Sequence, residues 1–337
     1  MSSGGGRLLL LFGMPTTPKI SVLIPNFNGV RFLPEAIDSV LAQDFRDFEL
    51  IVSDDHSADG SADLLRRQAG RDPRLRLHFQ ASNRGMVPHW NWCLEQARGE
   101  YVKFVFSDDL LASPAALGRL AALLDSDRTI ALAASARTVL DENSRPISTW
   151  NELPAGRHRG PEMIARCLCE DRNLIGEPSA VMFRRAAATR GFDPGWKQLV
   201  DLEMWLHLLG SGDLACLAEP LCAFRLHAGQ QSEANRRANV GPAERLHLLA
   251  RYLAHLPANA AGRPRSARER RAVFRCLYYS RHYAPRTPEN RVAEARLSAF
   301  LTPACYRLHW LRHRLTKPFV NLARLARRRT AAPAGRP

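Results

Sequence analysis

The sequence has no run of about 18 consecutive apolar residues, the length that a membrane-spanning helix requires. Its N-terminal apolar stretch, residues 8–12, is short, and no small-residue cleavage site follows it, so we expect no signal peptide. Residues 1–17 are predicted to be a disordered lead-in, with Met14 as an alternative start. An integral membrane protein is therefore not expected.

Regularly spaced cysteines are also missing. The seven cysteines are an odd number, no Cys-x-x-Cys motif occurs, and Cys167 and Cys169 are the closest pair. A disulfide framework and a zinc site are therefore not expected. Reduced thiols in a cytoplasmic protein are the interpretation that this pattern favours.

Both common glycine-rich phosphate loops are missing as well. No G-x-G-x-x-G follows the first predicted strand, and G-x-x-x-x-G-K-[ST] does not occur. If a nucleotide binds, acidic side chains and a cation must handle its diphosphate instead.

Acidic residues are scarce at one end of the chain. The formal net charge is +15, but residues 234–337 hold 23 Arg or Lys and four Glu, a local charge of +19. The preceding residues 1–233 carry a charge of −4. This asymmetry indicates that the C-terminal region faces an anionic surface.

Apolar residues recur at helical spacing near the end of this basic region, interrupted by Pro318. They are Leu308, Leu311, Leu315, Phe319, Leu322 and Leu325. A basic amphipathic helix of this kind can lie on an anionic membrane, so we expect peripheral contact with the inner face of the cytoplasmic membrane. The alternative is a helix packed on its own catalytic domain.

Predicted strands alternate with predicted helices through the first 124 residues. The strands are expected at residues 19–25, 48–52, 74–79 and 101–106. This alternation predicts βαβ units and an α/β fold with a mainly parallel sheet flanked by helices. Beyond that point we expect strands at 130–139 and 180–183, an apolar helix from 199, an edge strand at 221–226, and only helices after 241.

Two adjacent acids, Asp108 and Asp109, end the fourth predicted strand. Ser113 and Pro114 already form a suitable N-cap and first position for the next helix, so capping does not explain the acids. Ligands of open α/β sheets bind beyond the carboxyl ends of the strands. The pair is therefore a candidate cation site.

Two further acid positions complete a pattern. Asp54 and Asp55 end the second strand, which should place them at the same sheet edge as the first pair, although such residues often only make turns. Asp201, at the start of a late helix, could be a general base or only a helix N-cap. A helix N-terminus would keep its carboxylate ionised and lower its basicity.

Several segments resemble the family 2 inverting glycosyltransferases of the GT-A fold. They are residues 20–29 (ISVLIPNFNG), 54–60 (DDHSADG), 107–109 (SDD) and 201–205 (DLEMW). Residues 176–185 (GEPSAVMFRR) and 224–227 (FRLH) resemble segments of bacterial members that build cell-surface polysaccharide. The resemblance covers residues 18–233, which implies a GT-A domain there and a helical basic C-terminal region at 234–337.

The resemblance implies a role for each matching residue. The nucleotide-sugar would lie against Pro25, Asn26, Asp54, Asp55 and Asp108. Mn²⁺ or Mg²⁺ would be held by Asp109 with help from His227, and Asp201 would be the catalytic base. One departure is Phe106, which stands where many members have a further acid.

The predicted reaction is transfer of a sugar, with inversion, from a nucleotide-sugar donor to a glycan or lipid-linked acceptor. Two alternatives remain at this point. One is a metal-dependent nucleotidyltransferase, although it would normally show a basic glycine-rich loop after the first strand. The other is a nucleic-acid-binding protein that acts through its basic tail, and the acidic balance of residues 1–233 argues against this. We therefore expect no nucleic-acid partner.

Overall fold

The computed structural model describes residues 17–257 and 266–314. Residues 1–16 of the predicted lead-in, and the part of the predicted amphipathic helix beyond residue 314, lie outside the described residues.

The first half of the chain forms βαβ units, as predicted. The strands are β1 (Ile20–Asn26), β2 (Phe48–Asp54), β3 (Leu75–Phe79) and β4 (Tyr101–Phe104), and the helices between them are α1 (Leu33–Leu41), α2 (Ser61–Gln68) and α3 (Met86–Gln96). Strand β1 pairs in parallel with both β2 and β4, and β2 pairs in parallel with β3. All residues of β1, β2 and β4 are buried, because helices cover both faces of the sheet.

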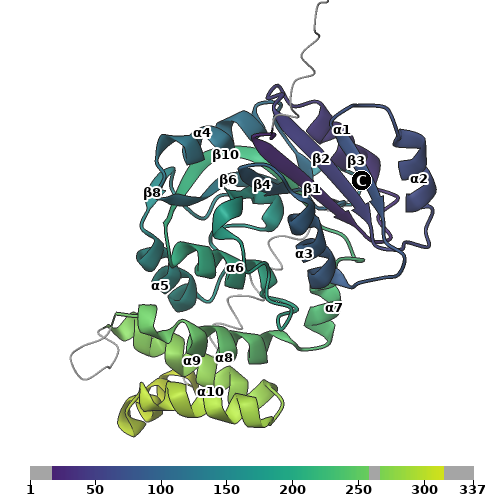
Figure 1. Cartoon of the computed structure of the whole chain (residues 1–337). Helices are drawn as coiled ribbons and strands as arrows, with labels where there is room; N and C mark the ends of the chain where they lie inside the picture. Colours follow the sequence, from purple (N-terminus) through teal and green to yellow (C-terminus); the bar gives the residue numbers. More distant parts are fainter. Residues whose placement is uncertain (1–16, 258–265, 315–337) are drawn as a thin grey trace, which may run out of the picture.

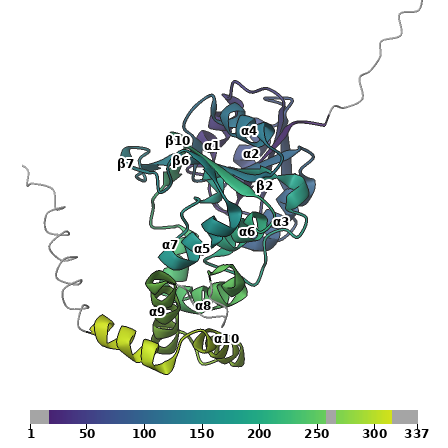
Figure 2. The same cartoon turned by 90° about the vertical axis from the view of Figure 1, so that its left-hand side faces the viewer.

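The second half extends this sheet to ten strands. Its elements are β5 (Leu110–Leu111), α4 (Ala116–Ser126), β6 (Ile130–Leu140), β7 (Pro146–Trp150), β8 (Gly156–His158), α5 (Gly160–Glu170), the 3₁₀-helix η1 (Pro178–Ala180), β9 (Val181–Arg184), the 3₁₀-helix η2 (Arg185–Ala187), α6 (Val200–Leu209) and β10 (Asp213–Arg225). The strand order is β3-β2-β1-β4-β9-β6-β10-β5, with β9 antiparallel to both of its neighbours. Helices α3, α5 and α6 lie on one face of the sheet, and α1 and α4 lie on the other (Figures 1 and 2).

Two expectations about the second half were wrong. The predicted edge strand at 221–226 is the end of the thirteen-residue β10, which lies between β6 on one side and β5 and β8 on the other. Register shifts on both sides of Pro220 interrupt the strand pattern and hide its first half. Helix α4 has Ala115 at its N-cap position, so Ser113 is not the cap. The acids therefore lie even further from the helix.

The C-terminal region is helical within the described residues, as predicted. It contains α7 (Gln231–Arg237), α8 (Gly241–Arg251), the 3₁₀-helix η3 (Leu253–His255), α9 (Ala267–Tyr283) and α10 (Pro288–Ala299), and residues 303–314 are also helical. Helices α8, α9 and α10 pack on one another, and α9 packs on α5 (Figure 1). No helix among residues 17–257 and 266–314 is long and apolar enough to cross a membrane.

Helix α8 also holds the start of α6. The buried carboxylate of Glu244 accepts hydrogen bonds from the backbone N–H groups of Lys197, Gln198 and Leu199, at 2.6, 2.9 and 2.8 Å. These residues immediately precede α6, whose N-cap position carries no side-chain cap of its own. The C-terminal region therefore supplies the acceptor for the N–H groups leading into this helix.

We predict that Glu244→Ala lowers the free energy of unfolding by roughly 2 to 3 kcal/mol, because three N–H groups lose an ionised acceptor. Urea unfolding measures this change. Glu162→Ala, which alters an exposed glutamate in the first turn of α5, is the matched control and should cost less than about 0.5 kcal/mol. Equal stability of the two variants would contradict the anchoring role of Glu244.

Candidate active site

The parallel register brings the ends of β1, β2 and β4 to one edge of the sheet. Asn26 lies opposite Asp54, and its amide donates a 2.8 Å hydrogen bond to the carboxylate of Asp54. Beyond β4, the N–H of Val105 still donates to the carbonyl of Leu23 at 2.9 Å. The first two acid pairs therefore follow strands that point the same way, as expected.

The turn after β1 lies directly against the loop that carries the second acid pair. A Cβ atom on Gly29 would come within 2.4 Å of Asn26 Oδ1 and 2.8 Å of Ser107 Oγ. Only glycine allows this close approach. The turn that follows Pro25 and Asn26 is thus held against Ser107, the residue before Asp108.

Asp54 and Asp55 are buried and hold the surrounding turns. The two oxygens of Asp54 accept from the amide of Asn26 and from the N–H of Ser57, at 2.8 and 3.0 Å. The two oxygens of Asp55 accept from the N–H groups of Arg84 and Gly85, at 2.9 and 3.1 Å. The turn-forming role is thus observed, and contact with a nucleotide base stays a prediction.

Asp109 carries an unpartnered carboxylate oxygen in a buried position. Its Oδ1 accepts from the backbone N–H of Arg225 at 3.0 Å, whereas no hydrogen bond of ordinary geometry reaches its buried Oδ2 from the described residues. Burial, together with the neighbouring charge of Asp108, raises the pKa of Asp109 well above its usual value, although the nearby Ser179 hydroxyl partly opposes this rise. An orphaned buried oxygen of this kind is expected where a ligand completes the site.

Asp108 and His227 meet beside Asp109. His227 Nε2 lies 3.0 Å from Asp108 Oδ2, although the two residues are far apart in the sequence. No group of three or more His, Cys, Asp or Glu side chains able to hold a metal occurs within the described part of the chain. A cation here would therefore depend on one or two carboxylates and on donor phosphates, which is a common arrangement for Mg²⁺.

Arg225 connects this site to two other elements, and the sequence analysis did not select it. Its fully buried guanidinium donates to the carbonyl of Asp108 at 2.8 Å, to Ser144 Oγ at 2.7 Å and to Glu35 Oε2 at 2.6 Å. It also lies 4.4 Å from the centre of the Phe32 ring. Arg225 is part of the segment FRLH that resembles the family, but only His227 was selected from that segment in the sequence analysis.

Phe106 belongs to an aromatic cluster. Its ring centre lies 4.7 Å from that of Trp90 and 6.5 Å from that of Phe104. The position at which many relatives have an acid is therefore used for apolar packing, which leaves Asp108 and Asp109 as the acids of this loop.

Asp201 occupies the first turn of α6, but it is not the N-cap, which is Leu199. Its two oxygens accept hydrogen bonds from the N–H of Leu202 at 2.7 Å and from the amide of Asn173 at 2.9 Å. Burial nevertheless raises the pKa of Asp201 to about 7, and the charge of Glu177 adds to the increase. The expectation that the helix end would keep its basicity low was wrong, because desolvation outweighs the hydrogen bonds.

Residues 173–180 connect Asp201 with the acid pair. Asn173 donates to the carbonyl of Gly176 as well as to Asp201, both at 2.9 Å. Further along, Ser179 Oγ accepts from the N–H of Phe106 at 3.0 Å, and the buried ammonium of Lys103 donates to the Ser179 carbonyl. The segment therefore lies between the two halves of the candidate site.

Comparisons with known proteins identify the family. Residues 21–192 match glycosyl transferase family 2. The chain belongs to this family. Glycosyl transfer is the activity for which this family is named, and membership argues against the nucleotidyltransferase and nucleic-acid-binding alternatives.

Relatives of this glycosyltransferase include proteins of bacterial glycan synthesis. Protein MT1568 of Mycobacterium tuberculosis is 33% identical over 58% of this chain and 63% of its own length. TuaG of Bacillus subtilis, named for teichuronic acid biosynthesis, is 27% identical over 60% of this chain and 78% of its own. A Campylobacter jejuni β-1,3-glucosyltransferase, named for the acceptor GalNAc(5)-diNAcBac-PP-undecaprenol, is 41% identical over 29% of this chain and 32% of its own. The chain thus spans less than two thirds of some relatives.

Solved structures confirm the GT-A fold of this glycosyltransferase. Staphylococcus aureus TarS in complex with UDP-GlcNAc superimposes with a TM-score of 0.59 at 18% identity, covering 84% of this chain and 82% of TarS. The Pyrobaculum calidifontis mannosyltransferase PcManGT, in complex with GDP-Man and Mn²⁺, gives 0.56 at 18% identity, covering 91% of this chain and 84% of its own. At this identity the likeness concerns the fold alone.

We predict that Arg225→Lys lowers the kcat/KM of the glycosyltransferase at least about tenfold, because one ammonium cannot replace a guanidinium that binds three acceptors. Steady-state kinetics measure this change. Arg119→Lys, at a half-exposed arginine paired with Glu219, is the matched control and should change little. An unimpaired, folded Arg225→Lys enzyme would rule out the positioning role.

Proposed function

We propose that the protein transfers a sugar from a nucleotide-sugar donor to a hydroxyl of a glycan or lipid-linked acceptor, with inversion, in cell-surface polysaccharide synthesis. The observation that carries the proposal is that residues 173–180 contact both Asp201 and the loop that ends in Asp109, two carboxylates in unlike surroundings. Asp109 offers a buried, unpartnered oxygen, and Asp201 has a pKa of about 7. The first suits a cation and the second suits a base. The names of TuaG and the Campylobacter enzyme support the polysaccharide context.

On the donor side, the nucleotide would lie along the ends of β1 and β2, against Pro25, Asn26, Asp54 and Asp55. Asp108 would border the diphosphate. The orphaned Oδ2 of Asp109 fits Mn²⁺ or Mg²⁺, with His227 as a second contact once it leaves Asp108. Such an ion, when bound, neutralises charge on the leaving diphosphate.

On the acceptor side, Asp201 would take the proton of the acceptor hydroxyl as that oxygen attacks the anomeric carbon. A base with a pKa near the working pH combines a large ionised fraction with adequate basicity. Asn173 and the N–H of Leu202 hold the carboxylate in place while it accepts the proton. One displacement on the face opposite the leaving group inverts the configuration.

A screen of UDP-, GDP- and dTDP-sugars for metal-dependent thermal stabilisation tests the function, since a ligand that binds only the folded state raises Tm. We expect one nucleotide class to raise Tm with Mn²⁺ present. In Asp109→Ala that rise should disappear, and calorimetry should show no metal-dependent donor affinity. Asp63→Ala, at an exposed aspartate of α2, should behave as wild type. Unchanged Mn²⁺-dependent affinity in Asp109→Ala would refute the metal role.

We predict that Asp201→Asn binds the donor normally but loses transfer by about 10²- to 10⁴-fold. In the wild type, kcat/KM should fall as the pH drops below about 7, because protonated Asp201 cannot accept a proton. Since the folded state raises the pKa of Asp201, ionising it costs stability as the pH rises toward 7, and Asn removes this cost. The variant should therefore stay folded at pH 8. Wild-type turnover by Asp201→Asn would exclude the base assignment.

We also propose that the GT-A domain is 18–233, that 234–337 is a basic region, and that the enzyme works in the cytoplasm at the membrane. Leu308, Trp310 and Leu311 are 50%, 38% and 51% exposed on one helix that also carries Arg307 and Arg314. Apolar side chains among arginines suit an anionic bilayer. Vesicles containing phosphatidylglycerol should bind the protein better than duplex DNA at matched salt, and the opposite order would contradict membrane contact.

A further inference from the structure

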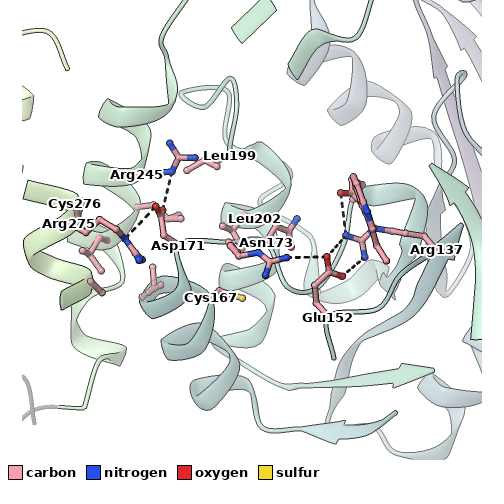
Figure 3. A pocket seen from close by; sticks show the side chains of 17 residues that line it. Arg137, Glu152, Cys167, Asp171, Asn173, Leu199, Leu202, Arg245, Arg275 and Cys276 are labelled. Carbon is pink, nitrogen blue, oxygen red and sulfur yellow. Dashed lines mark hydrogen bonds and ion pairs between the residues drawn. The ribbon is translucent and has the colours of Figure 1, made fainter. Parts of the chain in front are cut away.

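A cavity of about 500 Å³ lies between the catalytic domain and the C-terminal helices. Its walls come from β6, β7, α5, residues 171–177, α6, α8 and α9. Figure 3 shows charged side chains at both ends of the cavity: Arg137 and Glu152 at one end, and Asp171, Arg245 and Arg275 at the other. Leu202 and Asn173 lie between the two ends. The volume falls within the usual range of ligand pockets.

The cavity adjoins the proposed base. Asn173 lines it and donates a 2.9 Å hydrogen bond to Asp201 Oδ2. Leu199 and Leu202, which flank Asp201 in the sequence, line it as well. Asp201 itself does not line the cavity, so a molecule there would contact Asn173, whose amide holds the carboxylate proposed to receive the acceptor proton.

The charged groups of the cavity are paired with one another. Arg137 lies 3.0 Å from Glu152 and also contacts Glu177, and Arg245 lies 3.0 Å from Asp171. Paired guanidinium and carboxylate groups offer donors and acceptors side by side, which matches hydroxyl groups, since each hydroxyl both donates and accepts. Because the charges of the lining residues nearly cancel, the cavity does not favour a polyanionic ligand.

The rest of the lining is apolar. It consists mainly of leucines from α5, α6 and α8, with small residues from α5 and α9. They are Leu168, Leu199, Leu202, Leu248, Leu249, Cys167, Ala272 and Cys276. The cavity opens to solvent past Arg172 and Arg245, and an apolar wall beside paired charges suits an amphiphilic ligand.

We propose that this cavity is the acceptor subsite, that it takes the hydroxyl-rich end of an uncharged glycan, and that α8 and α9 form one wall of it. The inference rests on the proposed function and deepens it. Sugar hydroxyls bind the paired charges at Arg137 and Glu152, the apolar leucines cover the C–H groups and any aglycone, and Asn173 marks the side that faces Asp201. The basic C-terminal region thus takes part in acceptor selection.

The test fills the cavity from the C-terminal side. Ala272 on α9 is 3% exposed and lines the cavity, so Ala272→Leu places a larger side chain in it. Ala267→Leu is the matched control, because it makes the same substitution at an exposed position of the same helix. The probes are the octyl β-glycosides of glucose, galactose and N-acetylglucosamine, each tested as an acceptor at millimolar concentration with a donor found by the screen.

We expect wild type and Ala267→Leu to use at least one probe, and Ala272→Leu to show at least a tenfold higher acceptor KM with unchanged Tm and donor affinity. Hydrolysis of the donor by water should persist in Ala272→Leu and be lost in Asp109→Ala. Loss of the acceptor role alone is thereby distinguished from failure of the proposed function. The subsite would be overturned if Ala272→Leu and Ala267→Leu had equal acceptor KM values. It would also be overturned if the wild type used none of the probes.

Discussion

The anchoring of helix α6 by buried carboxylates is the interaction on which the position of Asp201 depends. Glu203, fully buried on this helix, receives two hydrogen bonds from Arg190, at 3.0 and 2.7 Å, one from Arg251 at 2.8 Å and one from Tyr252 at 2.9 Å. Glu244 holds the residues before the helix from the other direction. These two buried carboxylates are tolerated because each is paired with several donors. Breaking such a network lowers the stability of the folded protein.

This anchoring ties the C-terminal region to the helix that carries the proposed base. Arg251, Tyr252 and Glu244 all lie beyond residue 192, where the match to the family ends, yet they hold the helix that carries Asp201 and the residues before it. A base must be held within a fraction of an ångström of its productive position. The helices of the basic region therefore hold the start of the helix that carries Asp201, and they bound the cavity beside Asn173.

The donor half of the site depends on a different constraint, the parallel register of β1, β2 and β4. That register was predictable from alternating apolar strands and helices, and so was the convergence of the acids at one edge. Arg225 was not predictable, because its partners Glu35, Ser144 and Asp108 come from three separate segments. The first half of β10 was hidden by the bulge at Pro220.

The position of Asp201 could be predicted from sequence, whereas its pKa could not. Local reasoning considered only the helix end, which favours ionisation, but the carboxyl is desolvated by neighbours that fold against it from elsewhere. The cavity escaped prediction for the same reason, since its walls join α5 and α6 with α8 and α9. Short-range patterns identify candidate residues, and long-range packing determines their chemistry.

The central claim is a single displacement in which Asp201 activates the attacking oxygen. Its most direct test is the anomeric configuration of the first product formed from an α-linked nucleotide sugar, followed by ¹H NMR before mutarotation. With water as the acceptor, the account predicts that the free sugar appears first as the β-anomer. Initial appearance of the α-anomer would mean net retention and would contradict it.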